Sequence, residues 1–331
     1  MTGVPLLEVD NLSVVLPTER GPLRAVSGVS LSLTPGRTLG IVGESGSGKT
    51  MLSRAILRLL PHGARVSGKV RIDGRDLYAL PREALRRLRG RELAVIFQDP
   101  MTSLNPVLSI GGQIAEALRE HLGLGHAAAA LRAVELLASV GIPEPGRRAR
   151  QFPHQLSGGM RQRVAIAIAL SCAPRLLIAD EPTTALDVTV QAQILDLLAR
   201  EREKRGMAMI LITHDLGIVA GRTDAVAVMY AGGIVERAPT RALFKNMRNP
   251  YAEALLAAIP KLDAPAHTPL AAIGGAPPDP TRLPPGCAFH PRCRYAQERC
   301  RRETPALSAA TAEGHCYACW FPLSECAAVP A

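Results

Sequence analysis

The sequence has few aromatic residues and no long apolar segment. Aromatic side chains make up 3% of the 331 residues, so aliphatic side chains must build the core. No apolar run reaches the roughly 18 residues that a membrane-spanning helix needs. The longest run, 164–174, stops short of that length and contains Ser171. The N-terminus carries Glu8 and Asp10 instead of a basic segment followed by an apolar one, which argues against a secretory signal. We therefore expect a cytosolic chain.

Cysteine is almost absent from the first 286 residues, where Cys172 is the only one. The other six of the seven lie between Cys287 and Cys326. In a reducing compartment, such a local cluster indicates a metal or cofactor site before it indicates disulfides. The chain after about residue 260 is also rich in proline and poor in periodicity, which is typical of a linker or of irregular chain held by a ligand. We expect one domain over 1–260 and a C-terminal extension over 261–331.

The charge balance is basic. Lysine and arginine total 39 against 29 acidic residues, which gives a net charge of +10. Such a balance is typical of proteins that meet nucleic acid, an anionic membrane surface or a phosphorylated ligand, and it also occurs in soluble proteins with no polyanionic partner. Beyond residue 260 the charges nearly cancel, so the excess belongs to the first domain.

Short apolar segments alternate with segments of helical spacing over most of the chain. Residues 6–16 and 25–42 are expected to form strands and turns, and further strands are expected at 66–72, 93–97, 176–179, 209–213 and 226–230. Helices are expected at 51–60, 81–91, 109–140 and 188–205. This alternation predicts an α/β fold with an open, mostly parallel sheet. The helical block at 109–140 predicts a helical subdomain at about 99–160.

The segment from Gly43 to Thr50 matches G-x-x-x-x-G-K-[ST] at every fixed position, between an expected strand and an expected helix. Its glycines allow backbone N–H groups to close around phosphate oxygens, and the helix directs its positive end at them. Lys49 is expected to reach the β- and γ-phosphates, and the Thr50 hydroxyl to bind Mg²⁺. The expected nucleotide-binding residues here are Gly43, Glu44, Ser45, Gly46, Ser47, Gly48, Lys49, Thr50 and Met51.

Two carboxylates end the strand expected at 176–179. Asp180 at the strand tip can hold Mg²⁺ through water. Glu181, one residue further, can polarise an attacking water. The alternative is an ordinary acidic pair at a strand end. The phosphate loop upstream favours the catalytic interpretation.

A second glycine-rich turn, Leu156–Gln162, begins another expected helix and is a candidate anion site for the same physical reason. Gln98 and His214 each follow an expected strand, where ligands bind in open α/β sheets. The expected anion-binding residues of this turn are Ser157, Gly158, Gly159 and Gln162.

Taken in order, these motifs resemble those of the ATP-binding subunits of ABC transporters over about residues 6–260. The resemblance implies a P-loop ATPase with Leu156–Gln162 as its signature and Ala185–Asp187 as its D-loop. It implies catalytic roles for Glu181, His214 and Gln98. It assigns Mg²⁺ to Thr50, Gln98 and Asp180. Two such subunits would dimerise head to tail, with each ATP between the phosphate loop of one and the signature of the other.

Residues 98–106, 189–195 and the C-terminal extension resemble the oligopeptide and dipeptide importer subfamily, and Met101–Ser103 resembles one of its two paired ATPases. The implied partners are a second ATPase subunit (a copy or a paralogue), two membrane-spanning permease subunits and an extracytoplasmic solute-binding protein. The implied position is the cytoplasmic face of the inner membrane. The solute itself is left open among peptides, nickel and glycans.

One segment departs from the family pattern. In this family an aromatic side chain usually lies near the end of the first strand and stacks on adenine. Residues 14–17 contain none, so Leu16 is left to pack on the base. The alternative function is an ABC ATPase that acts on nucleic acid or ribosomes. Such proteins generally carry two ATPase units or a long inserted coiled coil, and this sequence has one unit and no such insert. No nucleic-acid partner is therefore expected.

The cysteines of the extension resemble a C-terminal motif of many peptide-importer ATPases, where it is interpreted as a 4Fe–4S site. The residues that match are Cys287, Cys293, Cys300 and Cys319. Four thiolates suit such a cluster. Cys316 forms a C-x-x-C with Cys319, so tetrahedral Zn²⁺ is the alternative, and free thiols without a metal are the third possibility. His290 is expected to pack or lie at the surface rather than to bind metal.

Overall fold

The computed structural model describes residues 4–99, 103–184, 186–259, 273–308, 311 and 314–323. The chain forms two compact units that are interleaved in sequence. The first unit comprises Met1–Leu6, Leu33–Arg37 and Asp76–Ile210. The second comprises Leu7–Ser32, Thr38–Arg75 and Leu211–Ala331. In the part of the chain that the structure describes, no helix combines the length and apolar character needed to cross a membrane. The domain boundary predicted at residue 260 stays a prediction.

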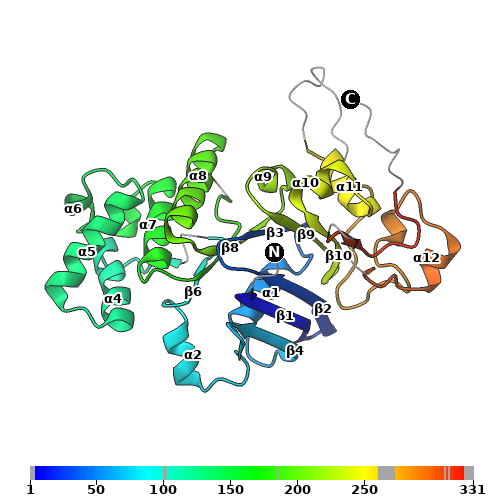
Figure 1. Cartoon of the computed structure of the whole chain (residues 1–331), viewed down its shortest axis with the longest axis horizontal. Coiled ribbons are helices and arrows are strands. Elements are labelled where there is room, and N and C mark those ends of the chain that lie inside the picture. Colours follow the sequence, from blue (N-terminus) through cyan, green and yellow to red (C-terminus); the bar gives the residue numbers. More distant parts are fainter. Residues whose placement is uncertain are drawn as a thin grey trace. The chain divides into compact units, whose positions relative to one another are not determined.

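The first unit is mainly helical. Its strands β6 (Leu93–Ile96) and β7 (Leu176–Asp180) pair in parallel. Its helices are α2 (Arg82–Leu88), α4 (Ile110–Leu122), α5 (His126–Ser139), α6 (Pro145–Arg148), the 3₁₀ helix η1 (Pro153–Gln155), α7 (Gly158–Leu170) and α8 (Val188–Arg205). Helices α4, α5 and α7 pack against one another (Figure 1).

The helical block predicted at 109–140 is confirmed as the pair α4 and α5. Ile110, Ile114 and Leu118 recur every four residues along α4 and are 0% exposed, which places them on one face of the helix. Burying each of these side chains contributes about 2 kcal/mol. The Ser109 hydroxyl caps the start of α4 by accepting a hydrogen bond from the Gly112 amide.

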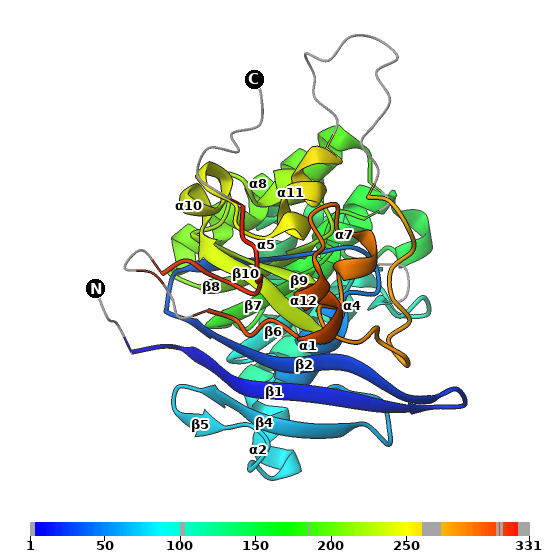
Figure 2. The ribbon, with the colours of Figure 1, turned by 90° about the vertical axis from the view of Figure 1, so that its right-hand side faces the viewer.

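The second unit contains an antiparallel sheet in the order β2-β1-β4 (Figure 2). Its strands are β1 (Leu7–Thr18), β2 (Gly21–Leu33) and β4 (Arg65–Ile72), with β5 (Arg75–Asp76) at the division between the units. A further set of strands runs in the order β11-β10-β9-β3. These strands are β3 (Thr38–Val42), β9 (Ala225–Tyr230), β10 (Gly233–Pro239) and β11 (Cys316–Tyr317).

Short helices complete the second unit. They are α1 (Lys49–Ile56), α9 (Leu216–Val219), α10 (Thr240–Lys245), α11 (Pro250–Ala257), the 3₁₀ helix η2 (His290–Arg292) and α12 (Glu298–Arg302). Strand β8 (Ala208–Thr213) carries the chain from the first unit into the second.

The predicted strands are confirmed, but the predicted parallel sheet is only part of the β-structure. Strands β3 and β9 pair in parallel, whereas β10 is antiparallel to both β9 and β11. The antiparallel sheet of β1, β2 and β4 was not foreseen. Helix α1 ends at Ile56 instead of continuing to residue 60, since Arg58 has a φ of 53° and a left-handed residue cannot continue a right-handed helix.

Candidate functional site

The predicted phosphate loop lies between β3 and α1 in the second unit. Gly48 begins the helix with a φ of 102°, a conformation that L side chains rarely adopt. A Cβ at Gly48 would also lie 2.3 Å from the carbonyl oxygen of Ala25. Glycine is therefore required at this position, and the predicted turn into a helix N-terminus is present.

Two polar side chains of this loop, Lys49 and Ser47, are buried. Lys49 is 5% exposed, and its Nζ donates to the carbonyl oxygens of Gly43 at 2.7 Å and Glu44 at 2.9 Å. The Oγ of Ser47 is buried and has no hydrogen-bond partner among the described residues. Buried polar atoms in folded proteins are nearly always paired, so Ser47 is ready to accept or donate a hydrogen bond to a ligand.

The signature turn begins α7 in the first unit. The Ser157 hydroxyl caps the helix, accepting a hydrogen bond from the Met160 amide at 3.4 Å. A Cβ at Gly159 would lie 2.9 Å from Cγ1 of Val190 on α8, so the two helices approach closely there. Gln162 is 1% exposed, and within the described ranges its Nε2 has no hydrogen-bond partner. This turn thus contains a second unpaired buried polar atom at a predicted nucleotide-binding residue.

Gln98 and Glu181 lie together in the first unit, just after the paired strands β6 and β7. The Nε2 of Gln98 donates to Oε2 of Glu181 at 3.1 Å. The Thr184 hydroxyl donates to the same oxygen at 2.9 Å. Glu181 has a φ of 47°, and such uncommon backbone conformations cluster at functional sites. Asp180, the preceding residue, is 2% exposed. Thr184 was not predicted from the sequence.

His214 directly follows β8 and is exposed. The next residue, Asp215, caps α9 by accepting a hydrogen bond from the Gly217 amide at 2.7 Å. The predicted nucleotide-binding residues thus belong to both compact units: residues 43–51 and His214 to the second, and the remainder to the first. Met101 and Ala185 lie outside the described residues. Leu16 is half-buried in β1.

The four matched cysteines line one cavity of about 640 Å³ in the second unit. The pKa of the Cys319 thiol is raised to about 11, mainly by burial and to a lesser extent by the nearby Cys287, Cys293 and Cys300. Burial also raises the pKa of the thiols of Cys287 and Cys293. These thiols are therefore protonated near neutral pH unless a metal displaces the proton.

Across the described part of the chain, no three His, Cys, Asp or Glu side chains form a group that could hold a metal ion. The donor type and number fit a cluster, but the predicted 4Fe–4S site is not supported by this geometry. Cys316 is directed elsewhere, because its Sγ donates to the Arg237 carbonyl oxygen at 3.6 Å. Cys326 lies outside the described residues.

Two residues that the sequence did not single out contact the phosphate loop. The Glu44 amide donates to the Tyr251 hydroxyl at 2.8 Å. The guanidinium of Arg292 pairs with the Glu44 carboxylate at 2.7 Å and 2.8 Å. Burial raises the pKa of Tyr251 well above its ordinary value, so the phenol stays neutral. The only sequence signal that could have drawn attention to Arg292 is its position directly before Cys293 in the cysteine motif.

Most of the chain is similar to known ATP-binding proteins. Residues 26–184 match the family model described as ABC transporter. Residues 235–300 match the model described as the C-terminal region of oligopeptide/dipeptide transporters. The dipeptide transport ATP-binding protein DppD of Escherichia coli (strain K12) is 49% identical over 321 residues, which is 97% of this chain and 98% of that protein.

Two further relatives extend this similarity. The oligopeptide transport ATP-binding protein OppD of Mycobacterium tuberculosis (strain H37Rv) is 51% identical over 304 residues, which is 92% of this chain and 50% of that protein. A dimeric, post-hydrolysis structure of the ATP-binding cassette MJ0796 bound to ADP and Pi has a TM-score of 0.64 and 28% identity, and the match covers 71% of this chain and 99% of that one. The predicted α/β P-loop fold is confirmed, and the chain belongs to the family of ABC transporter ATP-binding proteins, which hydrolyse ATP.

Proposed function

We propose that this chain is the ATP-hydrolysing subunit of an importer for dipeptides, oligopeptides or related solutes. The observation that carries the proposal is similarity over 97% of the chain to a dipeptide transport ATP-binding protein. The match over residues 235–300 to the oligopeptide/dipeptide transporter C-terminal region supports it independently. A role on nucleic acid or ribosomes is not favoured, because the similarity continues through the extension.

The proposed nucleotide contacts are the loop 43–51 and the signature residues Ser157, Gly158, Gly159 and Gln162. They are supported by the unpaired buried atoms of Ser47 and Gln162. Head-to-tail pairing of two subunits would place the signature of one chain on the ATP held by the other. The dimeric form of MJ0796 supports this arrangement.

Glu181 is the proposed general base. It takes a proton from the attacking water, whose oxygen bonds to the γ-phosphorus as the bond to the β–γ bridging oxygen breaks, leaving ADP and phosphate. Gln98 and Thr184 orient the Glu181 carboxylate through their hydrogen bonds to it. Lys49 stabilises charge on the phosphates, and His214 contacts the γ-phosphate.

Mg²⁺ bound with ATP would neutralise phosphate charge, and Thr50, Gln98 and Asp180 are the residues proposed to hold it. Their hydroxyl, amide and carboxylate oxygens are ligands that Mg²⁺ prefers.

The proposed partners are a second ATPase subunit, two permease subunits and an extracytoplasmic solute-binding protein, with this chain at the cytoplasmic face of the membrane. The test is to purify the tagged chain from membranes under anaerobic conditions and identify the proteins that accompany it. Two multi-span permeases and a second ATPase are expected. Ribosomes or nucleic acid in their place would overturn the proposal.

We also propose that Cys287, Cys293, Cys300 and Cys319 hold a metal, either in a 4Fe–4S cluster or as Zn²⁺. Support comes from their shared cavity and from their donor chemistry. Iron, sulfide and zinc in the anaerobically purified chain would be quantified. Cys300→Ser should lose most of the metal, whereas Cys172→Ser, a buried cysteine of the first unit, should retain it. A chain with neither metal contradicts the proposal.

A further inference from the structure

An ion pair joins the cysteine-rich extension to the phosphate loop. Arg292 ends η2, one residue before Cys293. Its Nη1 and Nη2 donate to the two carboxylate oxygens of Glu44 at 2.7 Å and 2.8 Å. The Arg292 side chain is 3% exposed and that of Glu44 is 24% exposed. This bidentate, largely buried pair differs from the exposed ion pairs that contribute little to stability.

Every N–H of the Arg292 guanidinium has an acceptor. In addition to the two bonds to Glu44, Nε donates to the Gly274 carbonyl oxygen at 2.9 Å and Nη2 to that of Ile273 at 3.3 Å. Nη1 also donates to the Tyr230 hydroxyl at 3.4 Å. Arginine has five such donors in a fixed planar arrangement, so the guanidinium is held in one orientation. Lysine could not reproduce this set of contacts.

Glu44 is held at its backbone as well. Its amide donates to the Tyr251 hydroxyl, and its carbonyl oxygen accepts from Lys49 Nζ at 2.9 Å and from the Ser47 amide at 3.2 Å. The second residue of the loop is therefore fixed through its amide, its carbonyl and its carboxylate. The carbonyl contact connects Glu44 directly to the lysine proposed to bind phosphate.

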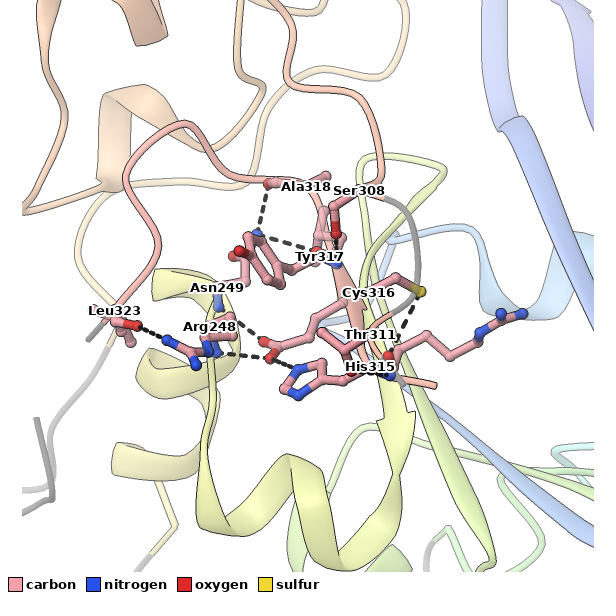
Figure 3. A network of polar contacts seen from close by, with 12 residues as sticks. Arg248, Asn249, Ser308, Thr311, His315, Cys316, Tyr317, Ala318 and Leu323 are labelled. Carbon is pink, nitrogen blue, oxygen red and sulfur yellow. Dashed lines mark hydrogen bonds and ion pairs between the residues drawn. The ribbon is translucent and has the colours of Figure 1, made fainter. Parts of the chain in front are cut away.

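The extension is also attached to the helix that carries Tyr251. The backbone amides of Arg248 and Asn249 donate hydrogen bonds to the buried Glu236 carboxylate of β10, which also contacts His315. Arg248, Asn249 and His315 are labelled in Figure 3. Asn249 Nδ2 donates to the Ala318 carbonyl oxygen at 2.9 Å. Asn249 Oδ1 accepts from the Tyr251 amide. Glu44 is thus connected to the extension both through Arg292 and through Asn249 and Tyr251.

We propose that Arg292 is a positioning residue of the ATP site, which holds the phosphate loop through Glu44 and makes the C-terminal extension part of that site. The proposal rests on the proposed nucleotide-binding role of residues 43–51. A loop fixed before ATP arrives loses less conformational freedom when it binds. Removing the guanidinium releases the Glu44 carboxylate and leaves the loop to be ordered by ATP itself.

The test is a double-mutant cycle on the full chain, with Arg292→Ala, Glu44→Ala and both together. Mg-ATP affinity is measured by calorimetry, and hydrolysis in a single turnover. Each single variant should raise the dissociation constant about tenfold, while the hydrolysis rate of bound ATP stays within about twofold, because positioning acts on binding. The double variant should be no weaker than either single variant, since the two residues act through one contact.

The matched control is Arg294→Ala, which removes a nearby arginine whose ion pair is with Glu253 rather than with the loop. Its ATP affinity should be unchanged. Trp320 is the only tryptophan of the chain and lies in the extension, so its emission reports whether each variant keeps the extension folded. Glu44→Gln, which keeps the shape of the side chain but loses its charge, provides a second variant if Glu44→Ala does not fold.

Unchanged affinity in folded Arg292→Ala, or strictly additive losses in the double variant, would overturn the positioning role. Lys49→Ala separates this result from failure of the site itself. If Lys49→Ala binds ATP normally, then the proposed phosphate loop is wrong. If it does not bind while Arg292→Ala does, the ATP site stands and only the positioning role fails.

Discussion

The ATPase motifs and the cysteine-rich extension are stabilised by different kinds of contact. The phosphate loop and the acidic strand end directly follow buried parallel strands, β3 and β7. In the extension, the described regular elements are only η2, α12 and the two-residue strand β11. Elsewhere it is held by isolated hydrogen bonds of the backbone, such as that from the Ala318 amide to the Val235 carbonyl oxygen. Side chains add others, from Asn249 to the Ala318 carbonyl oxygen and from Trp320 Nε1 to the Glu303 carbonyl oxygen.

This difference indicates how each region should respond to substitution. Removing a side chain from an ATPase motif deletes a chemical group while the strand beneath it persists. Some side chains, such as Asn249, attach the extension through a hydrogen bond. Removing one of them leaves its buried partner without a hydrogen bond, which lowers the free energy of unfolding. The first kind of change should impair catalysis or binding, and the second should impair stability.

The largest expected effect is that of Glu181→Gln. This variant should bind ATP normally and hydrolyse it about 10²- to 10⁴-fold more slowly, since the attacking water loses its base. Calorimetry measures binding and single-turnover hydrolysis measures the rate. Glu203→Gln, whose parent side chain is 72% exposed, is the matched control and should be fully active. Normal turnover in Glu181→Gln would exclude Glu181 as the base.

Lys49→Ala should bind Mg-ATP about 100-fold more weakly, because truncating one member of a buried charged contact typically has an effect of that size. Calorimetry on the full chain measures the change. Lys204→Ala, on the exposed face of α8, should bind as the parent does. An unchanged affinity in Lys49→Ala would remove the phosphate loop from the site.

The smallest of these effects is expected at Asn249, which is 5% exposed and attaches the extension through its hydrogen bond to Ala318. Asn249→Ala removes the donor to Ala318 and the cap of α11, which should lower the free energy of unfolding by about 2 kcal/mol. Denaturant unfolding followed by Trp320 emission measures the loss. Asn246→Ala, three residues earlier, should leave the transition unchanged. Equal stability of both variants would mean that Asn249 does not anchor the extension.

Most of the regular elements could be predicted, because apolar spacing along a strand or helix depends on residues that are close in sequence. Helix α8 begins and ends at the predicted residues, Val188 and Arg205. Strand β10 was missed, because Glu236 and Arg237 interrupt its few apolar residues. The end of α1 was also missed, because the left-handed backbone at Arg58 has no signal in the apolar pattern.

Some residues of the candidate site could likewise be predicted from the sequence, and others could not. The phosphate loop, the signature turn and the pair Gln98 and Glu181 could be found from spacing, since each motif follows or begins a regular element. Thr184 and Tyr251 carry no motif, and only the hydrogen bonds in the structure show that they contact Glu181 and Glu44. The cysteines could be counted from the sequence, but their shared cavity depends on the folded chain.

The sequence by itself determined the α/β ATPase class and proposed the residues for phosphate chemistry, because both rest on local motifs and periodicity. Only the tertiary structure brings the Arg292 guanidinium into contact with the Glu44 carboxylate, 248 residues away along the chain. It also brings the His315 ring into contact with the buried carboxylate of Glu236. Such contacts between residues far apart in sequence form only when the chain packs, so no local pattern encodes them.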